Sequence, residues 1–220
     1  VLTFDGTVPS ITTLTATASP NTVQYTGGTQ TIQGTTYHHL TIAVSGTATL
    51  GANTIANGNV TITSGTFEPT ASYTLTGSGT NELSVTDTIR VMQSTFAGTY
   101  VSFETVTLNT GSKVNYKRNA TQTVDNTLSY YDLTIAGTGG HIKTLGGNTT
   151  VNNNLIVASG SIFALSAYNL TVTGTSDITG TLNDDSATGT NIFTGAVTLN
   201  SGSTWSNTNN PAFEFRGGLT

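Results

Sequence analysis

The 220-residue sequence contains no cysteine and very little charge. Disulfide bonds and thiolate metal sites are therefore excluded, and stability has to come from backbone pairing and side-chain packing. Charged residues make up 8% of the chain, with six Lys and Arg against eleven Asp and Glu. Because nucleic-acid binding needs clustered basic residues that displace phosphate counterions, we expect no nucleic acid among its partners.

Long apolar runs are missing as well. No stretch approaches the roughly 18 apolar residues of a membrane-spanning helix, so we expect no membrane insertion. The sequence is rich in small polar residues instead, with 50 Thr, 25 Gly and 20 Asn. This polar, weakly charged composition favours an extracellular or cell-surface protein.

An internal repeat of about 91 residues organises the chain. The segment 49–65 aligns without a gap to 144–160, and nine of the seventeen aligned positions are identical. The match continues on the N-terminal side through Val23/Val114, Tyr25/Tyr116, Gln30/Gln122 and Tyr37/Tyr130. We therefore predict one continuous repeat region over 1–220, with long units at about 23–112 and 114–203 and partial units at 1–22 and 204–220.

Short strand motifs recur within each long unit at intervals of about 20 residues, the length of one solenoid coil. Each motif alternates apolar residues with Thr or Ser, which is the two-residue period of a half-buried strand. The pattern predicts an all-β fold, a repeat β-solenoid, with an array of β-sandwich domains of about 90 residues as the alternative. The residues predicted to point into the core are Leu40, Ile42, Val60 and Ile62, with their repeat mates Leu133, Ile135, Leu155 and Val157.

The segments 23–77 and 114–174 share a Tyr-x-x-Leu-Thr-Ile strand, then Thr-Leu-Gly, Asn-x-Asn-[Val/Leu], Ser-Gly and Tyr-x-Leu-Thr. This pattern, which covers about half of the chain, resembles a repeat of very large bacterial surface and secreted proteins described as β-strand-repeat or adhesin-like. The resemblance implies right-handed β-helical coils and a cell-surface, matrix or filament role.

Carboxylates occur together only in the Asn183-Asp184-Asp185 turn, which invites comparison with β-helical polysaccharide hydrolases if His141 and Lys143 lie nearby. Glycosidases need two carboxyl groups on one side of the substrate, whereas adjacent strand residues face opposite ways. A polar turn is the better interpretation. We predict no enzyme and no catalytic residue.

Metal and cofactor sites are not predicted either. His38 and His39 are neighbours, so on a strand they cannot both bind one ion, and no third ligand lies nearby in the sequence. Calcium held by Asp177, Asp184 and Asp185 is the remaining candidate, although no repeated calcium motif is present. Sequons at Asn59, Asn119, Asn148 and Asn169 are fewer than the roughly six expected by chance in a chain so rich in Asn, Ser and Thr, so they are no evidence of glycosylation.

Two surface features remain. Outward Thr pairs bracket inward apolar residues, and stacked coils would align some of them into ladders. A flat Thr ladder can order water and bind ice, but Thr is also the usual solvent-facing residue of a strand. Aromatic side chains are candidate stacking platforms for sugar rings, but packing against other aromatic residues is the better interpretation. The Thr pairs are Thr61/Thr63, Thr74/Thr76, Thr105/Thr107 and Thr171/Thr173, and the aromatic residues are Tyr37, Tyr130 and Trp205.

The sequence as a whole favours a structural or adhesive extracellular repeat protein without catalysis. A carbohydrate-binding or carbohydrate-processing β-helix is the alternative, and ice binding is a third. Neither Val1 to Pro9 nor Pro211 to Thr220 reads as a charged or helical cap. We therefore expect self-association end to end or stacking on neighbouring repeats of the same chain, and surface glycans as a further class of partner.

Overall fold

The computed structural model describes residues 1–6, 11–184 and 189–220. About 50% of the chain is strand and 2% helix, and parallel strands stack as a β-solenoid of about 10 turns. The predicted solenoid is thus confirmed over the β-sandwich alternative, whose strands would pair antiparallel. Two compact units are present: unit 1 comprises 1–93 and 97–112, and unit 2 comprises 94–96 and 113–220.

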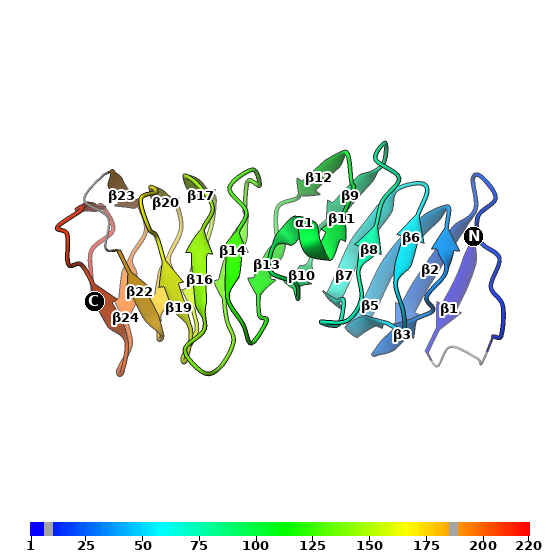
Figure 1. Ribbon diagram of the computed structural model, residues 1–220, viewed down its shortest axis with the longest axis horizontal. Helices are drawn as coiled ribbons and strands as arrows, with labels where there is room; N and C mark the ends of the chain where they lie inside the picture. The colour runs from blue at the N-terminus through cyan, green and yellow to red at the C-terminus, as the bar shows by residue number, and fades with distance from the viewer. Residues whose placement is uncertain (7–10, 185–188) are drawn as a thin grey trace. The chain divides into compact units, whose positions relative to one another are not determined.

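From residue 22 to residue 101, each coil of unit 1 contributes strands to three faces, and these strands pair in parallel with the strands one coil away (Figure 1). The long strands β5 and β7 run through the first and second faces. The strands of the first and second faces are β1 (Leu2–Asp5), β2 (Thr22–Gly27), β3 (Gln30–Ile32), β5 (His39–Leu50), β7 (Val60–Glu68), β9 (Glu82–Val85), β10 (Thr88–Val91) and β12 (Thr105–Leu108). The third face contains β4 (Thr36–Tyr37), β6 (Thr54–Ala56), β8 (Leu75–Thr76) and β11 (Tyr100–Val101), and the short helix α1 (Phe96–Thr99) precedes β11.

Unit 2 has the same three-sided coil, with each face forming a separate stack of parallel strands. The first face contains β13 (Lys113–Tyr116), β15 (Asp132–Ile135), β18 (Leu155–Val157), β21 (Ser176–Ile178) and β24 (Val197–Leu199). The second face contains β14 (Gln122–Val124), β16 (Ile142–Leu145), β19 (Ile162–Ala164), β22 (Thr181–Asn183) and β25 (Thr204–Ser206). The third face contains β17 (Thr149–Val151), β20 (Leu170–Val172), β23 (Thr190–Phe193) and β26 (Ala212–Phe215). Within the described ranges, no helix has the length and apolar character needed to cross a membrane.

The interior of each unit is built from the apolar residues that alternate with Thr and Ser along the strands. All eight core residues predicted from the repeat are 0% exposed. They also stack in register, because Leu40 pairs with Val60 in unit 1 and Leu133 pairs with Leu155 in unit 2. The predicted strand register is therefore confirmed.

The corner between the first and second faces of unit 1 requires glycine at one position. Gly65 has a φ of 77°, in the left-handed region that residues with a side chain rarely adopt. A Cβ atom at Gly65 would lie 2.4 Å from the carbonyl oxygen of Val44 in the preceding coil. The coils can therefore stack closely at this corner only because the side chain is absent.

A pair of buried tyrosines closes one turn of unit 1. Tyr37 donates its hydroxyl hydrogen to the Gln33 carbonyl (2.7 Å), and Tyr25 donates to the Tyr37 hydroxyl (2.8 Å). The backbone N–H of Gln33 donates in turn to the Tyr25 hydroxyl (3.2 Å). The hydroxyls thus satisfy both backbone groups of one turn residue inside an otherwise apolar core, where an unpaired polar group would cost about 1–3 kcal/mol.

Unit 2 repeats this arrangement with different turn chemistry. Tyr130 donates to the Asp125 carbonyl (2.7 Å), the Tyr116 and Tyr130 hydroxyls lie 2.9 Å apart, and the Asp125 N–H donates to Tyr116 (2.9 Å). Loss of hydration on burial raises the pKa of both tyrosines above the ordinary value. Both hydroxyls therefore stay protonated and able to donate at neutral pH.

Candidate functional site

The second face of unit 1 carries a regular array of surface groups. Its outward side chains form two columns that cross four coils, and we call this array the threonine face. The first column is Thr29, Thr47, Thr66 and Thr88, and the second is Thr31, Thr49, Glu68 and Arg90.

Strand register places these side chains at fixed intervals. Thr31 pairs with Thr49, Thr47 with Thr66, and Thr66 with Thr88. Neighbouring strands lie about 4.8 Å apart, and residues two apart on one strand are separated by about 7 Å. The hydroxyl and methyl groups therefore form a grid with two constant spacings.

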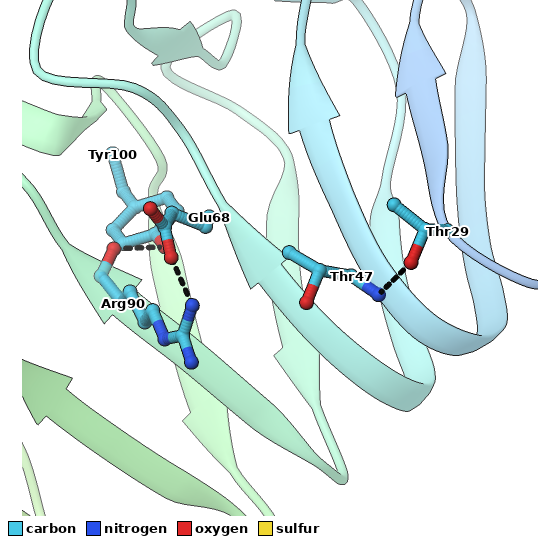
Figure 2. Close-up of polar contacts among 5 residues, drawn as sticks. All are labelled: Thr29, Thr47, Glu68, Arg90 and Tyr100. Atoms are coloured by element: carbon cyan, nitrogen blue, oxygen red, sulfur yellow. Dashed lines mark hydrogen bonds and ion pairs between the residues drawn. The ribbon is translucent and has the colours of Figure 1, made fainter.

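Two contacts connect neighbouring positions within the columns (Figure 2). The backbone N–H of Thr47 donates to the Thr29 hydroxyl (3.4 Å), one coil away. At the other end of the second column, Arg90 pairs with Glu68, and Tyr100 donates to the Arg90 carbonyl (2.8 Å). The ion pair carries both charges of the array and bounds its hydroxyl-bearing part.

None of the outward Thr pairs expected from the sequence lies on the threonine face. Of the proposed pairs, Thr61 lies instead in a mixed column of the first face, between Thr41 and Ser84. The signal that marks the threonine face is the recurrence of Thr-x-Thr at 29–31 and 47–49, followed by Thr66 and Thr88 at similar intervals. The aligned face of unit 2 differs, because Ile142, Ile162 and Ala164 take outward positions there.

The hydrolase-like residues have separate partners. Asp184 is 0% exposed and accepts a hydrogen bond from Asn191, whereas Asp185 lies outside the described residues. Lys143 is also fully buried, and its Nζ donates to the carbonyls of Arg118 and Ala120 (2.6 Å each). These contacts give Asp184 and Lys143 structural roles within unit 2.

The pKa of Lys143 is lowered because its ammonium group is buried and donates to carbonyl oxygens, not to a carboxylate. Loss of hydration, with a smaller repulsion from the Arg118 guanidinium, lowers the pKa of the Lys143 ammonium to about 8. Unit 1 has Ala48 at the aligned position, buried in the core of its own unit. The buried amine is therefore particular to the second repeat.

The metal candidates also have hydrogen-bonding partners of their own. His38 and His39 stack edge to face with ring centroids 4.3 Å apart, and His39 Nδ1 accepts the backbone N–H of Asn59 (2.9 Å). Asp177 accepts a hydrogen bond from the Asn200 side chain. In the described part of the chain, no three His, Asp or Glu side chains converge on a possible ion position.

The proposal that Tyr37 and Tyr130 form sugar-stacking platforms is wrong. Both rings are 0% exposed and belong to the tyrosine pairs of the core, so neither face is open to a ligand. Trp205 is half-buried and packs edge to face against Phe193 and Phe213 (5.6 and 5.0 Å between ring centroids). Packing among aromatic residues, the interpretation that the sequence favours, therefore describes all three rings.

The sequon asparagines take part in contacts between coils. Asn59, Asn119 and Asn148 each accept a backbone N–H from the next coil through Oδ1, at 2.9–3.1 Å. The N–H that Asn148 accepts belongs to Asn169, the fourth sequon residue. These asparagines therefore connect successive coils.

Comparison with known proteins adds no relative. No family model, curated protein or solved structure matches this chain significantly.

Proposed function

We propose that this chain is a structural or adhesive repeat module of an extracellular or cell-surface protein, acting in a cell surface, matrix or filament. The observation that supports the proposal is the stacking of parallel coils within each unit, which is in register except for shifts around Ala43 between β5 and β7. Such stacking makes a stiff spacer whose length grows with repeat number. The adhesin-like sequence pattern and the low charge are consistent with this role.

The partners in this proposal are further coils, supplied by neighbouring repeats or by a second copy joined end to end, and surface glycans. Strand β1 pairs with β2 alone among the named strands, and residues 218–220 lie beside β24 as the last row of the first face in unit 2. Leu2 and Leu219 are 45% and 51% exposed on these outer rows. A stacked coil would cover both side chains and pair the outer backbone groups.

Sedimentation velocity over a range of protein and salt concentrations tests the end-to-end association. We expect linear assemblies that persist in high salt, because few charges are involved, and that are lost in L2K and L219K. Ile156→Lys is the matched control, since Ile156 is 43% exposed on a lateral strand. A parent that remains monomeric at high concentration, or an I156K variant as defective as L219K, would refute this mode of association.

Enzyme assays test the structural role itself. We expect no hydrolysis of acidic or neutral polysaccharides, while a glycan array reports adhesive binding. Hydrolysis that is abolished by Asp184→Asn in a folded protein would overturn the structural proposal in favour of a carbohydrate-processing β-helix.

The threonine face supports ice binding as a second candidate function. A grid of hydroxyl and methyl groups with two constant spacings can hold water in a fixed array, as an ice surface requires. Thermal hysteresis and ice recrystallisation assays test it with Thr49→Lys, at the centre of the grid, against Thr86→Lys, an exposed position outside it. Activity that T49K abolishes and T86K retains supports this function, and inactivity of the parent refutes it.

A further inference from the structure

One hydrogen-bonded contact between coils of unit 1, which we call the His39 joint, depends on a histidine. His39 Nδ1 accepts the backbone N–H of Asn59, and Asn59 Oδ1 accepts the N–H of Glu82 in the following coil (3.1 Å). The imidazole lies directly against Gly58, where a Cβ atom would be 2.6 Å from Nδ1. Gly58 therefore provides the space that the ring occupies.

Unit 2 builds the same joint from other residues. Asp132 occupies the position aligned with His39, and its Oδ1 accepts the backbone N–H of Asn154 (2.9 Å). Asn153 replaces Gly58 and donates its side-chain amide to the same Oδ1 (2.8 Å). Asn154 Oδ1 then accepts the N–H of Thr175 (2.9 Å), as Asn59 does for Glu82.

The two units therefore preserve the hydrogen bond but not the acceptor. A carboxylate remains an acceptor down to about pH 4, whereas a protonated imidazole has two N–H donors and no acceptor. We infer that His39 makes the joint of unit 1 sensitive to mild acid, and that the Asp132 joint of unit 2 resists it. On protonation, Nδ1–H faces the N–H of Asn59, and the ring has to leave its place against Gly58.

The surroundings of His39 contain few other charges. On the preceding coil, Thr22 pairs with His39, and the Asn21 carbonyl accepts the N–H of His39. His38 is the titratable neighbour on the same strand, and Glu82 follows one coil beyond Asn59. The contacts of His39 with the adjacent coils are thus made by uncharged backbone groups and by Thr22, and the titratable side chains near it are His38 and Glu82.

NMR of the full chain tests the inference in two ways. At about pH 7.5, the ¹⁵N shifts should show His39 Nδ1 without a proton. Between about pH 7.5 and pH 5, amide exchange of Asn59, corrected for intrinsic rates, should lose about tenfold in protection, roughly one hydrogen bond. The Asn154 amide should keep its protection over the same range.

A double substitution in unit 1 should reproduce the acid resistance of the Asp132 joint. The double variant H39D/G58N copies the joint of unit 2 and should make Asn59 protection independent of pH, whereas H38N should keep the acid sensitivity. A protonated Nδ1 at neutral pH, equal Asn59 protection at both pH values, or loss of the effect in H38N would each overturn the inference. The measurements on the parent need no variant, so a folding defect in H39D/G58N does not affect them.

Discussion

Leu133→Asp provides the sharpest test of the strand register in unit 2. Leu133 is 0% exposed and stacks between Val114 of the preceding coil and Leu155 of the following one. The adjacent Thr134 faces outward on the same strand and is half-buried. A shift of one residue would exchange these two environments, because successive strand residues point to opposite faces.

The expected magnitude follows from the burial of Leu133. Truncating a buried leucine to alanine costs about 2–5 kcal/mol, and an unpaired buried carboxylate adds several kcal/mol or takes up a proton. A loss of this size is comparable with the whole stability of a typical domain, about 5–15 kcal/mol. Unit 2 of L133D should therefore be unfolded or close to unfolding, while Thr134→Asp should change stability by less than about 1 kcal/mol.

Urea titrations followed by circular dichroism and tryptophan fluorescence measure both effects, since Trp205 reports on unit 2. Leu133→Ala supplies an intermediate loss in case L133D does not accumulate as folded protein. The proposed register is refuted if L133D has the midpoint of the parent, or if T134D loses as much stability as L133A.

The tyrosine pairs and Lys143 give two pH-dependent predictions for unit 2. Burial raises the pKa of Tyr116 and Tyr130 in the folded protein, whereas the unfolded chain releases these tyrosine protons above about pH 10. The free energy of unfolding of unit 2 should therefore fall by about 3 kcal/mol per pH unit above pH 10. Ultraviolet absorption should show these two phenolates only on unfolding; their earlier ionisation in folded protein would contradict the assignment. The pKa of Lys143 is lowered to about 8, so the unfolded chain binds the extra proton between about pH 8 and pH 10, and stability should rise there by at most about 3 kcal/mol. Urea midpoints of Lys143→Met should lack this rise, and an equal rise in K143M would exclude Lys143 as its source.

The repeat was readable from the sequence because its strongest signals are local. Alternation of apolar residues with Thr identified the strands, and the recurrence of the same motifs identified the coils. Leu40, Ile42, Leu133 and Ile135 could be assigned to the core because a two-residue period leaves a single apolar side.

It was harder to predict whether individual tyrosine and lysine side chains lie on the surface or in the core. Tyr37 and Tyr130 were candidates for a sugar-binding surface, since nothing local distinguishes an exposed tyrosine from one whose hydroxyl reaches a backbone group. Lys143 was a candidate catalytic group for a similar reason. Its acceptors lie on Arg118 and Ala120, more than twenty residues away along the chain.

The sequence by itself determined the all-β class, the coil length and the side of each strand that faces inward, because these depend on periods of two and about twenty residues. The tertiary structure decided which coils lie in register and therefore which side chains become neighbours. The threonine face, the tyrosine pairs and the His39 joint all join residues from different parts of a coil or from different coils. Such contacts depend on the position of each corner along the chain. A single residue such as Gly65 can fix a corner, because only glycine leaves enough space for the backbone of the neighbouring coil.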